Sequence, residues 1–238
     1  PVATGLAGEP TIERDFGFGL TAGTVLLDGV AIDPAAVTWG DGSITWTVSD
    51  DPDAPDYVAA GEYQLVVTHA NGNSTTEGVT VTVGDATTPV PTRVGELGSI
   101  QAAIDAADPG DLIIVGPYSY EEIVIMWKPV RLQGSGPGAT FISGLKRPTE
   151  KLANWRTKMD CLFGIVAGCT KVVDALPGQV AAATGFDTEE GATITVLGPS
   201  AKKAKNTFTK GDRARIDGMS ISGGDTGGGV FVNGYAHR

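Results

Sequence analysis

Residues 99–115 read Ser-Ile-Gln-Ala-Ala-Ile-Asp-Ala-Ala-Asp-Pro-Gly-Asp-Leu-Ile-Ile-Val, and this stretch decides the fold of the second half of the chain. Ser99 is a favourable helix N-cap residue, and the apolar residues after it recur at helical spacing until Pro109 and Gly110 end the pattern. A short run of β-favouring residues, 112–115, follows at once. The stretch therefore predicts one short amphipathic helix followed directly by a buried strand.

Further short strand patterns follow this helix, each bounded by glycine or proline. They cover 121–125 and 129–133, and similar patterns return at 215–222 and 228–234. Strands of about three to five residues with bends between them are typical of a solenoid, in which each layer contacts only its neighbours. The predicted helix would cover the first layer, which otherwise exposes apolar core and unpaired strand edges.

The same residues resemble the N-terminal cap and first coil of pectin-lyase-like right-handed parallel β-helices. The pattern is carried by 99–107, 109–115, 118–122 and Lys128-Pro-Val-Arg-Leu-Gln-Gly134. The resemblance implies that 97–238 are the opening, incomplete part of such a β-helix, and that further chain or another subunit covers its open end. In polysaccharide lyases of this fold the calcium-binding aspartates and the basic catalytic residue lie on middle coils. No catalytic position is therefore carried over onto this chain.

Residues 145–214 are predicted to form a long insertion off the solenoid. Long decorations of a solenoid collect on one face, where they either line a binding groove or pack as a lid over the end. The insertion also contains a basic run, which either is a solvated loop or contacts an acidic polysaccharide. Its lysines are Lys202, Lys203, Lys205 and Lys210.

Residues 1–84 contain about seven short strand patterns, separated by turn signals such as Asp28-Gly29 and Asn71-Gly72. Alternation at Ile44, Trp46 and Val48 places apolar side chains on one face, as a half-buried strand requires. A β-sandwich is predicted from this spacing. The Thr/Pro-rich segment 85–96 after it is predicted to be a semi-rigid linker.

The first segment also resembles an IPT/TIG immunoglobulin-like domain. The resemblance is carried by Pro10-Thr-Ile12, Gly17-Phe-Gly19, Ser43-Ile-Thr-Trp-Thr-Val48 and Gly61-Glu-Tyr63 in that order, whereas the loop 49–58 is longer than is usual in the family. It implies a spacer or interaction module; some copies accompany carbohydrate-active enzymes, and others mediate adhesion or dimerisation. The whole chain is thus predicted to be mainly β: an Ig-like β-sandwich at 1–84, and an incomplete right-handed parallel β-helix at 97–238 with one short capping helix and a long insertion.

The net charge of −11 is unevenly distributed along the chain. The first 85 residues carry thirteen acidic residues and a single basic one, Arg14. So acidic a segment repels nucleic acid and anionic membrane surfaces, which excludes both as partners. No stretch approaches the ~20 apolar residues of a membrane span.

An acidic loop in the first segment is the candidate metal site. Asp50, Asp51, Asp53 and Asp56 supply the hard oxygen ligands that Ca²⁺ prefers. Their spacing does not match the EF-hand pattern, and two prolines interrupt the loop. A solvated loop without bound calcium is the alternative.

Aromatic residues and cysteines of the second segment are the remaining candidates. Aromatic side chains bind sugars by stacking, and four of them are candidate ligand-binding residues: Tyr118, Tyr120, Trp127 and Trp155. The two cysteines, Cys161 and Cys169, form either a disulfide, which an oxidising compartment allows, or two buried thiols. A zinc site is excluded because the chain has only two histidines, and neither has ligand spacing.

These features favour a secreted or cell-surface protein of bacterial type with a binding or structural role. The expected partners are a polysaccharide or a surface protein, bound through the face of the β-helix. One alternative is an extracellular polysaccharide lyase or hydrolase whose catalytic coils lie beyond residue 238. Another is an accessory or filament-forming part of a larger complex. The first interpretation is preferred because the sequence contains no recognisable catalytic constellation.

Overall fold

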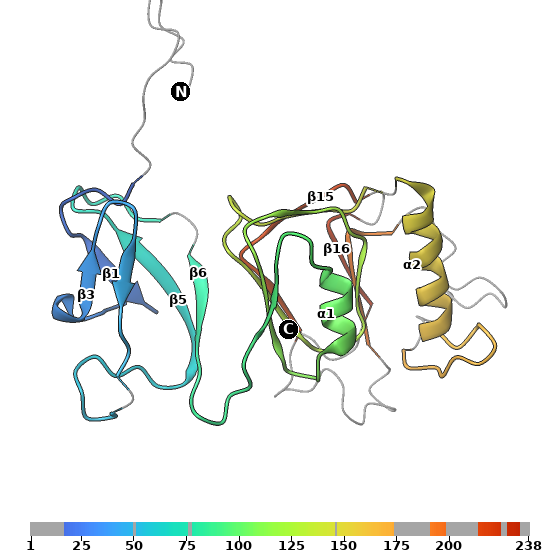
Figure 1. The fold of residues 1–238 in the computed structure, drawn as a ribbon, viewed down its shortest axis with the longest axis horizontal. Helices are drawn as coiled ribbons and strands as arrows, with labels where there is room; N and C mark the ends of the chain where they lie inside the picture. The colour runs from blue at the N-terminus through green and yellow to red at the C-terminus, as the bar shows by residue number, and fades with distance from the viewer. Residues whose placement is uncertain are drawn as a thin grey trace, which may run out of the picture. The chain divides into compact units, whose positions relative to one another are not determined.

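A computed structural model describes residues 17–49, 51–75, 78–145, 147–173, 191–198, 214–224 and 228–233. The chain divides into two compact units, Pro1–Thr88 and Pro89–Arg238, here called unit 1 and unit 2. The division lies inside the segment predicted to be a linker. Both units consist mainly of β-strands arranged in several sheets (Figure 1).

Unit 1 contains a four-stranded antiparallel sheet in the order β2-β1-β5-β6 and a separate hairpin of β3 and β4. A two-residue turn joins β1 to β2, and both of its residues, Asp28 and Gly29, have the positive φ that such a tight hairpin turn requires. The short 3-10 helix η1, Pro34–Ala36, connects β2 to β3. The strands are β1 Thr24–Leu27, β2 Val30–Ala31, β3 Val37–Trp39, β4 Ile44–Trp46, β5 Gly61–Thr68 and β6 Val79–Val83.

One apolar core joins the two sheets of unit 1. Val25, Leu27 and Ile32 form its buried centre, and side chains from β3, β4 and β5 pack against them. Ile44 and Trp46 of β4 are among these side chains, as the alternating pattern predicts. The sheets of unit 1 therefore face each other across a shared interior.

Unit 2 is built from parallel sheets through which the chain passes repeatedly in the same order. In its described part, the sheets run β7-β8-β11-β14, β9-β12-β15 and β10-β13-β16. Each passage through the three sheets is here called a layer. Layer 1 contains β8 Leu112–Val115, β9 Ser119–Tyr120 and β10 Val124–Met126; layer 2 contains β11 Arg131–Gly134, β12 Phe141–Ser143 and β13 Ile194–Leu197; layer 3 contains β14 Arg215–Asp217, β15 Ser220–Ser222 and β16 Val230–Asn233.

The layers are in register, so residues of one kind stack in columns. On the third sheet Val124 is aligned with Ile194, and Ile194 is aligned with Val230. On the first sheet Ile113 is aligned with Leu132. The aligned side chains of layers 1 and 2 point inward and are buried in one continuous core: Val124, Ile194, Ile113 and Leu132.

Helix α1, Ile100–Ala106, closes one end of this core (Figure 1). The Ser99 side chain caps the helix by accepting a hydrogen bond from the Ala102 amide. Ile100 and Ile104 are completely buried in the same cluster as the inward-facing strand residues. The predicted helix is therefore confirmed.

Three features of unit 2 differ from the sequence predictions. The prediction that all of 145–214 lie off the solenoid is wrong, because β13 lies within this range and pairs in parallel with β10 and β16. A second helix, α2 at Thr149–Leu162, was not predicted. Part of the predicted linker forms strand β7, Thr92–Val94, because its backbone pairs with β8. The lysine run at 202–210 lies outside the described residues.

Candidate functional site

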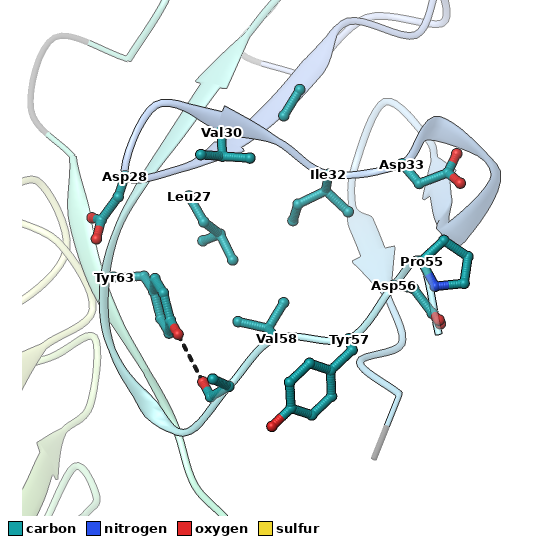
Figure 2. Close-up of a pocket in the computed structure, with 12 residues that line it drawn as sticks. Leu27, Asp28, Val30, Ile32, Asp33, Pro55, Asp56, Tyr57, Val58 and Tyr63 are labelled. Atoms are coloured by element: carbon teal, nitrogen blue, oxygen red, sulfur yellow. Dashed lines mark hydrogen bonds between the residues drawn. The ribbon is translucent and has the colours of Figure 1, made fainter. Parts of the chain in front are cut away.

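A pocket of about 300 Å³ opens in unit 1 between strand β2 and the segment 55–59 (Figure 2). Leu27, Ile32, Val58 and Tyr63 line it, and all four belong to the apolar core. Val30 also lines the pocket but is 71% exposed. The pocket is therefore a place where the core of unit 1 meets solvent.

Local hydrogen bonds hold the wall formed by 55–59. The Tyr57 amide donates to the Ala54 carbonyl at 3.1 Å, and the Ser49 amide donates to the Asp56 carbonyl at 3.3 Å. The Tyr63 hydroxyl donates to the Ala59 carbonyl at 2.8 Å, drawn as the dashed line in Figure 2. The opposite wall is fixed by the tight turn between β1 and β2. Both walls are thus held by contacts that need no ligand.

Three carboxylates lie at the margin of the pocket: Asp28, Asp33 and Asp56. Asp28 accepts a hydrogen bond from the Gln64 amide at 2.7 Å, and Asp33 accepts one from the Ala35 amide at 2.9 Å. Each of these two carboxylates is therefore oriented by the backbone. An apolar floor with negative charge at its margin suits a ligand that combines an apolar group with a cation.

The acidic loop predicted to bind calcium is organised as a series of turns. Asp50 lies outside the described residues. The Asp51 carboxylate accepts the Asp53 amide at 3.0 Å, and the Asp51 amide donates to the Ser49 hydroxyl at 3.1 Å. Within the described ranges, no group of three or more histidine, cysteine, aspartate or glutamate residues is arranged to hold a metal ion. Asp51, Asp53 and Asp56 are therefore not brought together as a metal site.

Two of the four predicted sugar-binding aromatics are buried, which corrects that prediction for them. Tyr120 is 3% exposed, and its hydroxyl donates to the Val94 carbonyl at 3.0 Å. Burial raises the pKa of the Tyr120 phenol above its ordinary value of 10.0. Trp155 is also 3% exposed, in the cluster between α2 and the third sheet. Both side chains contribute to the protein interior.

The other two aromatics lie nearer the surface. Tyr118 is 38% exposed and meets the Tyr120 ring edge-on at 6.5 Å between centroids. Trp127 is half-buried; its indole N–H donates to Asp105 at 2.8 Å, and the Lys128 ammonium lies 4.5 Å from the ring centroid. The indole of Trp127 is thus engaged by its own chain, whereas Tyr118 remains accessible.

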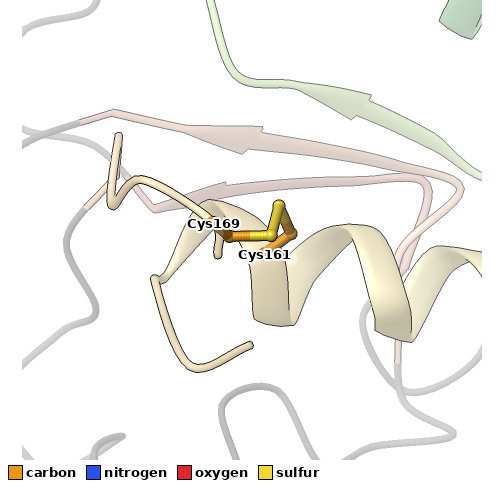
Figure 3. The surroundings of a disulfide bond; sticks show 2 residues. All are labelled: Cys161 and Cys169. Atoms are coloured by element: carbon orange, nitrogen blue, oxygen red, sulfur yellow. A yellow bond between two sulfur atoms is a disulfide. The ribbon is translucent and has the colours of Figure 1, made fainter. Parts of the chain in front are cut away.

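Cys161 and Cys169 are joined by a disulfide (Figure 3). The bond links the last turn of α2 to the loop that follows it, across a sequence separation of 8 residues. Leu162, Phe163 and Val173 nearby belong to the buried cluster that holds α2 against the third sheet. The disulfide therefore fixes the end of the helix at its packing interface.

Sequence reasoning missed the pocket of unit 1. Its apolar residues were assigned to strands or to the acidic loop, and alternation along a strand does not show where a core remains open. The available signal was the apolar pair Tyr57-Val58 at the end of the loop 49–58.

No family model matches the chain, and no curated protein or solved structure matches it either. Among the residues that the structure describes, no helix is both long enough and apolar enough to cross a membrane. The function is accordingly inferred from the geometry of this chain.

Proposed function

We propose that this chain is a secreted or cell-surface binding and structural protein whose ligand site is the pocket of unit 1. In this proposal unit 1 is an immunoglobulin-like module of the IPT/TIG type, and unit 2 is the start of a right-handed parallel β-helix. Two antiparallel sheets around one core support the first assignment. Parallel sheets visited in a repeated order, with a helix at one end, support the second.

The pocket is the observation that carries the binding role. Its volume of about 300 Å³ lies at the lower end of the range typical of ligand sites. Its floor is apolar, and ligand pockets are lined mainly by apolar side chains. The carboxylates at its margin provide the few polar groups that orient a ligand in such sites.

The disulfide supports the proposed location. Structural disulfides persist in oxidising compartments and are rare where thiols are kept reduced. The bridge between Cys161 and Cys169 joins a helix to its own following loop, and the surrounding side chains are buried. Such a structural bridge is consistent with a protein that functions outside the cytoplasm.

Binding is assigned to unit 1 rather than to the face of unit 2 because of the aromatic residues. Of the four candidates for sugar stacking, Tyr120 and Trp155 are buried, and Trp127 is bonded to Asp105. A platform for a polysaccharide needs several aromatic faces in one row, and Tyr118 alone does not supply it. The polysaccharide lyase and hydrolase alternatives gain no support from the described residues.

A binding screen with a matched pair of variants tests this role. The immobilised chain is exposed to a display library of random peptides and to an array of neutral and acidic polysaccharides. Val30→Trp places an indole at the pocket opening from an exposed position, whereas Thr45→Trp adds the same group to an exposed position of β4, away from the pocket. We expect ligands that bind the parent chain and Thr45→Trp but lose at least ~10-fold in affinity for Val30→Trp, about 1.4 kcal/mol. Ligands insensitive to Val30→Trp, no ligand at all, or unsaturated sugar products would each contradict the proposal.

A further inference from the structure

We propose that the pocket recognises an extended peptide that adds to the free edge of β2. The peptide inserts one apolar side chain into the pocket and places lysine or arginine side chains at the carboxylate margin. This inference rests on the proposed binding role of unit 1 and names the ligand class.

Strand β2 offers an unpaired backbone edge beside the pocket. It ends the sheet order β2-β1-β5-β6 and, within the described residues, pairs only with β1. Leu27 and Val30 flank the two-residue turn and form the first hydrogen-bonded pair, and the Ile32 amide donates to the Val25 carbonyl at 2.9 Å. Hydrogen-bonded and non-hydrogen-bonded pairs alternate in an antiparallel ladder. The N–H and C=O of Ala31, between these two pairs, therefore point away from β1.

The pocket adjoins this edge. Val30, Ala31 and Ile32 line it together with the opposite wall at 55–59. A peptide strand that pairs with Ala31 would direct every second side chain toward the same face. A volume of about 300 Å³ accommodates one or two side chains rather than a large ligand. Backbone pairing would then supply affinity, and the pocket would select the apolar side chain.

Charge selects a basic peptide over other extended segments. Asp33 and Asp56 lie at the pocket margin, and the first 85 residues contain Arg14 as their one basic residue. Cationic side chains are attracted to such a margin, and the attraction weakens as salt is added. A second copy of unit 1 paired through β2 would bring two acidic margins together. The structure therefore favours a basic partner over self-association.

Fluorescence anisotropy with one defined probe tests the inference. The probe is a labelled peptide, Thr-Lys-Thr-Leu-Thr-Lys-Thr, in which lysine, leucine and lysine share one face of an extended strand. The control probe replaces both lysines by glutamate. We expect the lysine probe to bind with an affinity that falls as salt is added, and the glutamate probe not to bind.

Two sets of variants separate the backbone contribution from the charge contribution. Ala31→Pro removes the outward N–H at an edge position where proline is tolerated, and Ala31→Ser keeps this donor. We expect Ala31→Pro to lose about 10-fold in affinity and Ala31→Ser to bind like the parent chain. Asp33→Asn combined with Asp56→Asn should remove most of the salt dependence. Asparagine at position 33 retains the turn cap that the Ala35 amide makes, and thermal melting verifies that each variant folds.

Three results would overturn the inference. If Val30→Trp abolishes binding of the probe but Ala31→Pro does not, strand addition is wrong while the proposed binding role stands. If the lysine probe does not bind, the ligand class is wrong, and the library screen still judges the binding role. If the chain self-associates in sedimentation experiments and Ala31→Pro abolishes the association, a second copy is the occupant of the edge.

Discussion

The two ends of the layered stack in unit 2 contain the same kinds of residue but bury them differently. At the end closed by α1, the inward-facing Val124 and Met126 are 0% exposed. Their aligned counterparts in layer 3, Val230 and Val232, are each 41% exposed. Position in a column is thus not sufficient to bury a side chain. A cover is also needed, and the structure shows one at the α1 end.

The cover at the α1 end satisfies polar groups as well as apolar ones. Strand β10 has an outer edge there, and the Gln101 side chain bonds to it. Its amide nitrogen donates to the Ile125 carbonyl at 3.1 Å, and its amide oxygen accepts from the Ile125 N–H at 2.7 Å. One side chain thereby replaces both hydrogen bonds of a neighbouring strand.

The helix that carries Gln101 is itself held from the strand side. Glu122 accepts hydrogen bonds from the amides of Ile100 at 2.9 Å and Gln101 at 3.1 Å. These amides belong to the first turn of α1, which has no intrahelical partners for them. A carboxylate at this position also interacts favourably with the positive end of the helix dipole. Helix and strands therefore complete each other's hydrogen bonds.

At the other end, each strand of layer 3 has one partner among the described residues. Strands β14, β15 and β16 pair with β11, β12 and β13 respectively. The expectation that further chain or another subunit covers this end stays a prediction.

The largest expected effect tests whether helix α1 accounts for the deeper burial of the residues at its end of the stack. Ile104→Ala removes a completely buried side chain from helix α1, and such substitutions typically lower the free energy of unfolding by about 2–5 kcal/mol. Val232→Ala in layer 3 should lower the free energy of unfolding by less than about 1 kcal/mol, because this side chain is 41% exposed. Urea unfolding followed by far-UV circular dichroism measures both. Equal losses would show that the two ends are equally buried in solution.

A smaller effect is expected from Gln101→Glu, which tests the polar part of the cover. In the parent chain the Gln101 side chain donates to the Ile125 carbonyl and to Asp105, the latter at 3.0 Å. The substitution removes both donors and places a carboxylate beside Asp105. We expect a loss of about 1–3 kcal/mol in the free energy of unfolding, measured by urea unfolding, because the Ile125 carbonyl loses its donor and two carboxylates come close together. Ala102→Glu adds the same charge on the exposed side of α1 and should change stability by no more than about 0.5 kcal/mol. If both variants lose the same stability, the hydrogen bonds of Gln101 to β10 do not stabilise the folded chain.

The closed end was also the part most accessible to sequence reasoning. The cap residue Ser99 and the apolar pair Ile100 and Ile104 are local signals within one helix. Helix α2 was missed because its N-cap, Pro148, makes no side-chain cap, and because few of its residues are apolar. Its buried residues Trp155 and Met159 do lie four positions apart, a signal that was available.

Other features depended on contacts between distant segments. The strand pattern of β13 was recognised, but its place in the third sheet depends on pairing with β10, far away in the sequence. Tyr120 was expected at the surface, yet its ring is inward-facing and its hydroxyl reaches the carbonyl of Val94. The pocket of unit 1 also depends on contacts between distant segments, because tertiary packing brings its two walls together. Periodicity indicates which side chains face inward and does not indicate where two segments leave a gap.

The smallest expected effect concerns the hydrogen bond between the Tyr120 hydroxyl and strand β7. Tyr120→Phe removes the hydroxyl that donates to the Val94 carbonyl of β7 and should cost about 1 kcal/mol in the free energy of unfolding at neutral pH. The folded state raises the pKa of this phenol above 10.0, chiefly because burial disfavours the phenolate. The contribution of the neutral phenol is therefore fully present below pH 10 and is lost as the pH rises through the folded-state pKa.

Urea unfolding of the parent chain and Tyr120→Phe between pH 7 and about pH 11 measures this loss, because other tyrosines and lysines titrate equally in both and cancel in the difference. The gap in stability between the two should narrow as the pH rises above 10. Tyr118→Phe is the control, since its ring is exposed and contacts Tyr120 only edge-on. A constant gap across this pH range would mean that the Tyr120 phenol ionises as easily in the folded chain as in the unfolded one. The interior beside α1 would then be accessible to water, as Val230 and Val232 of layer 3 are.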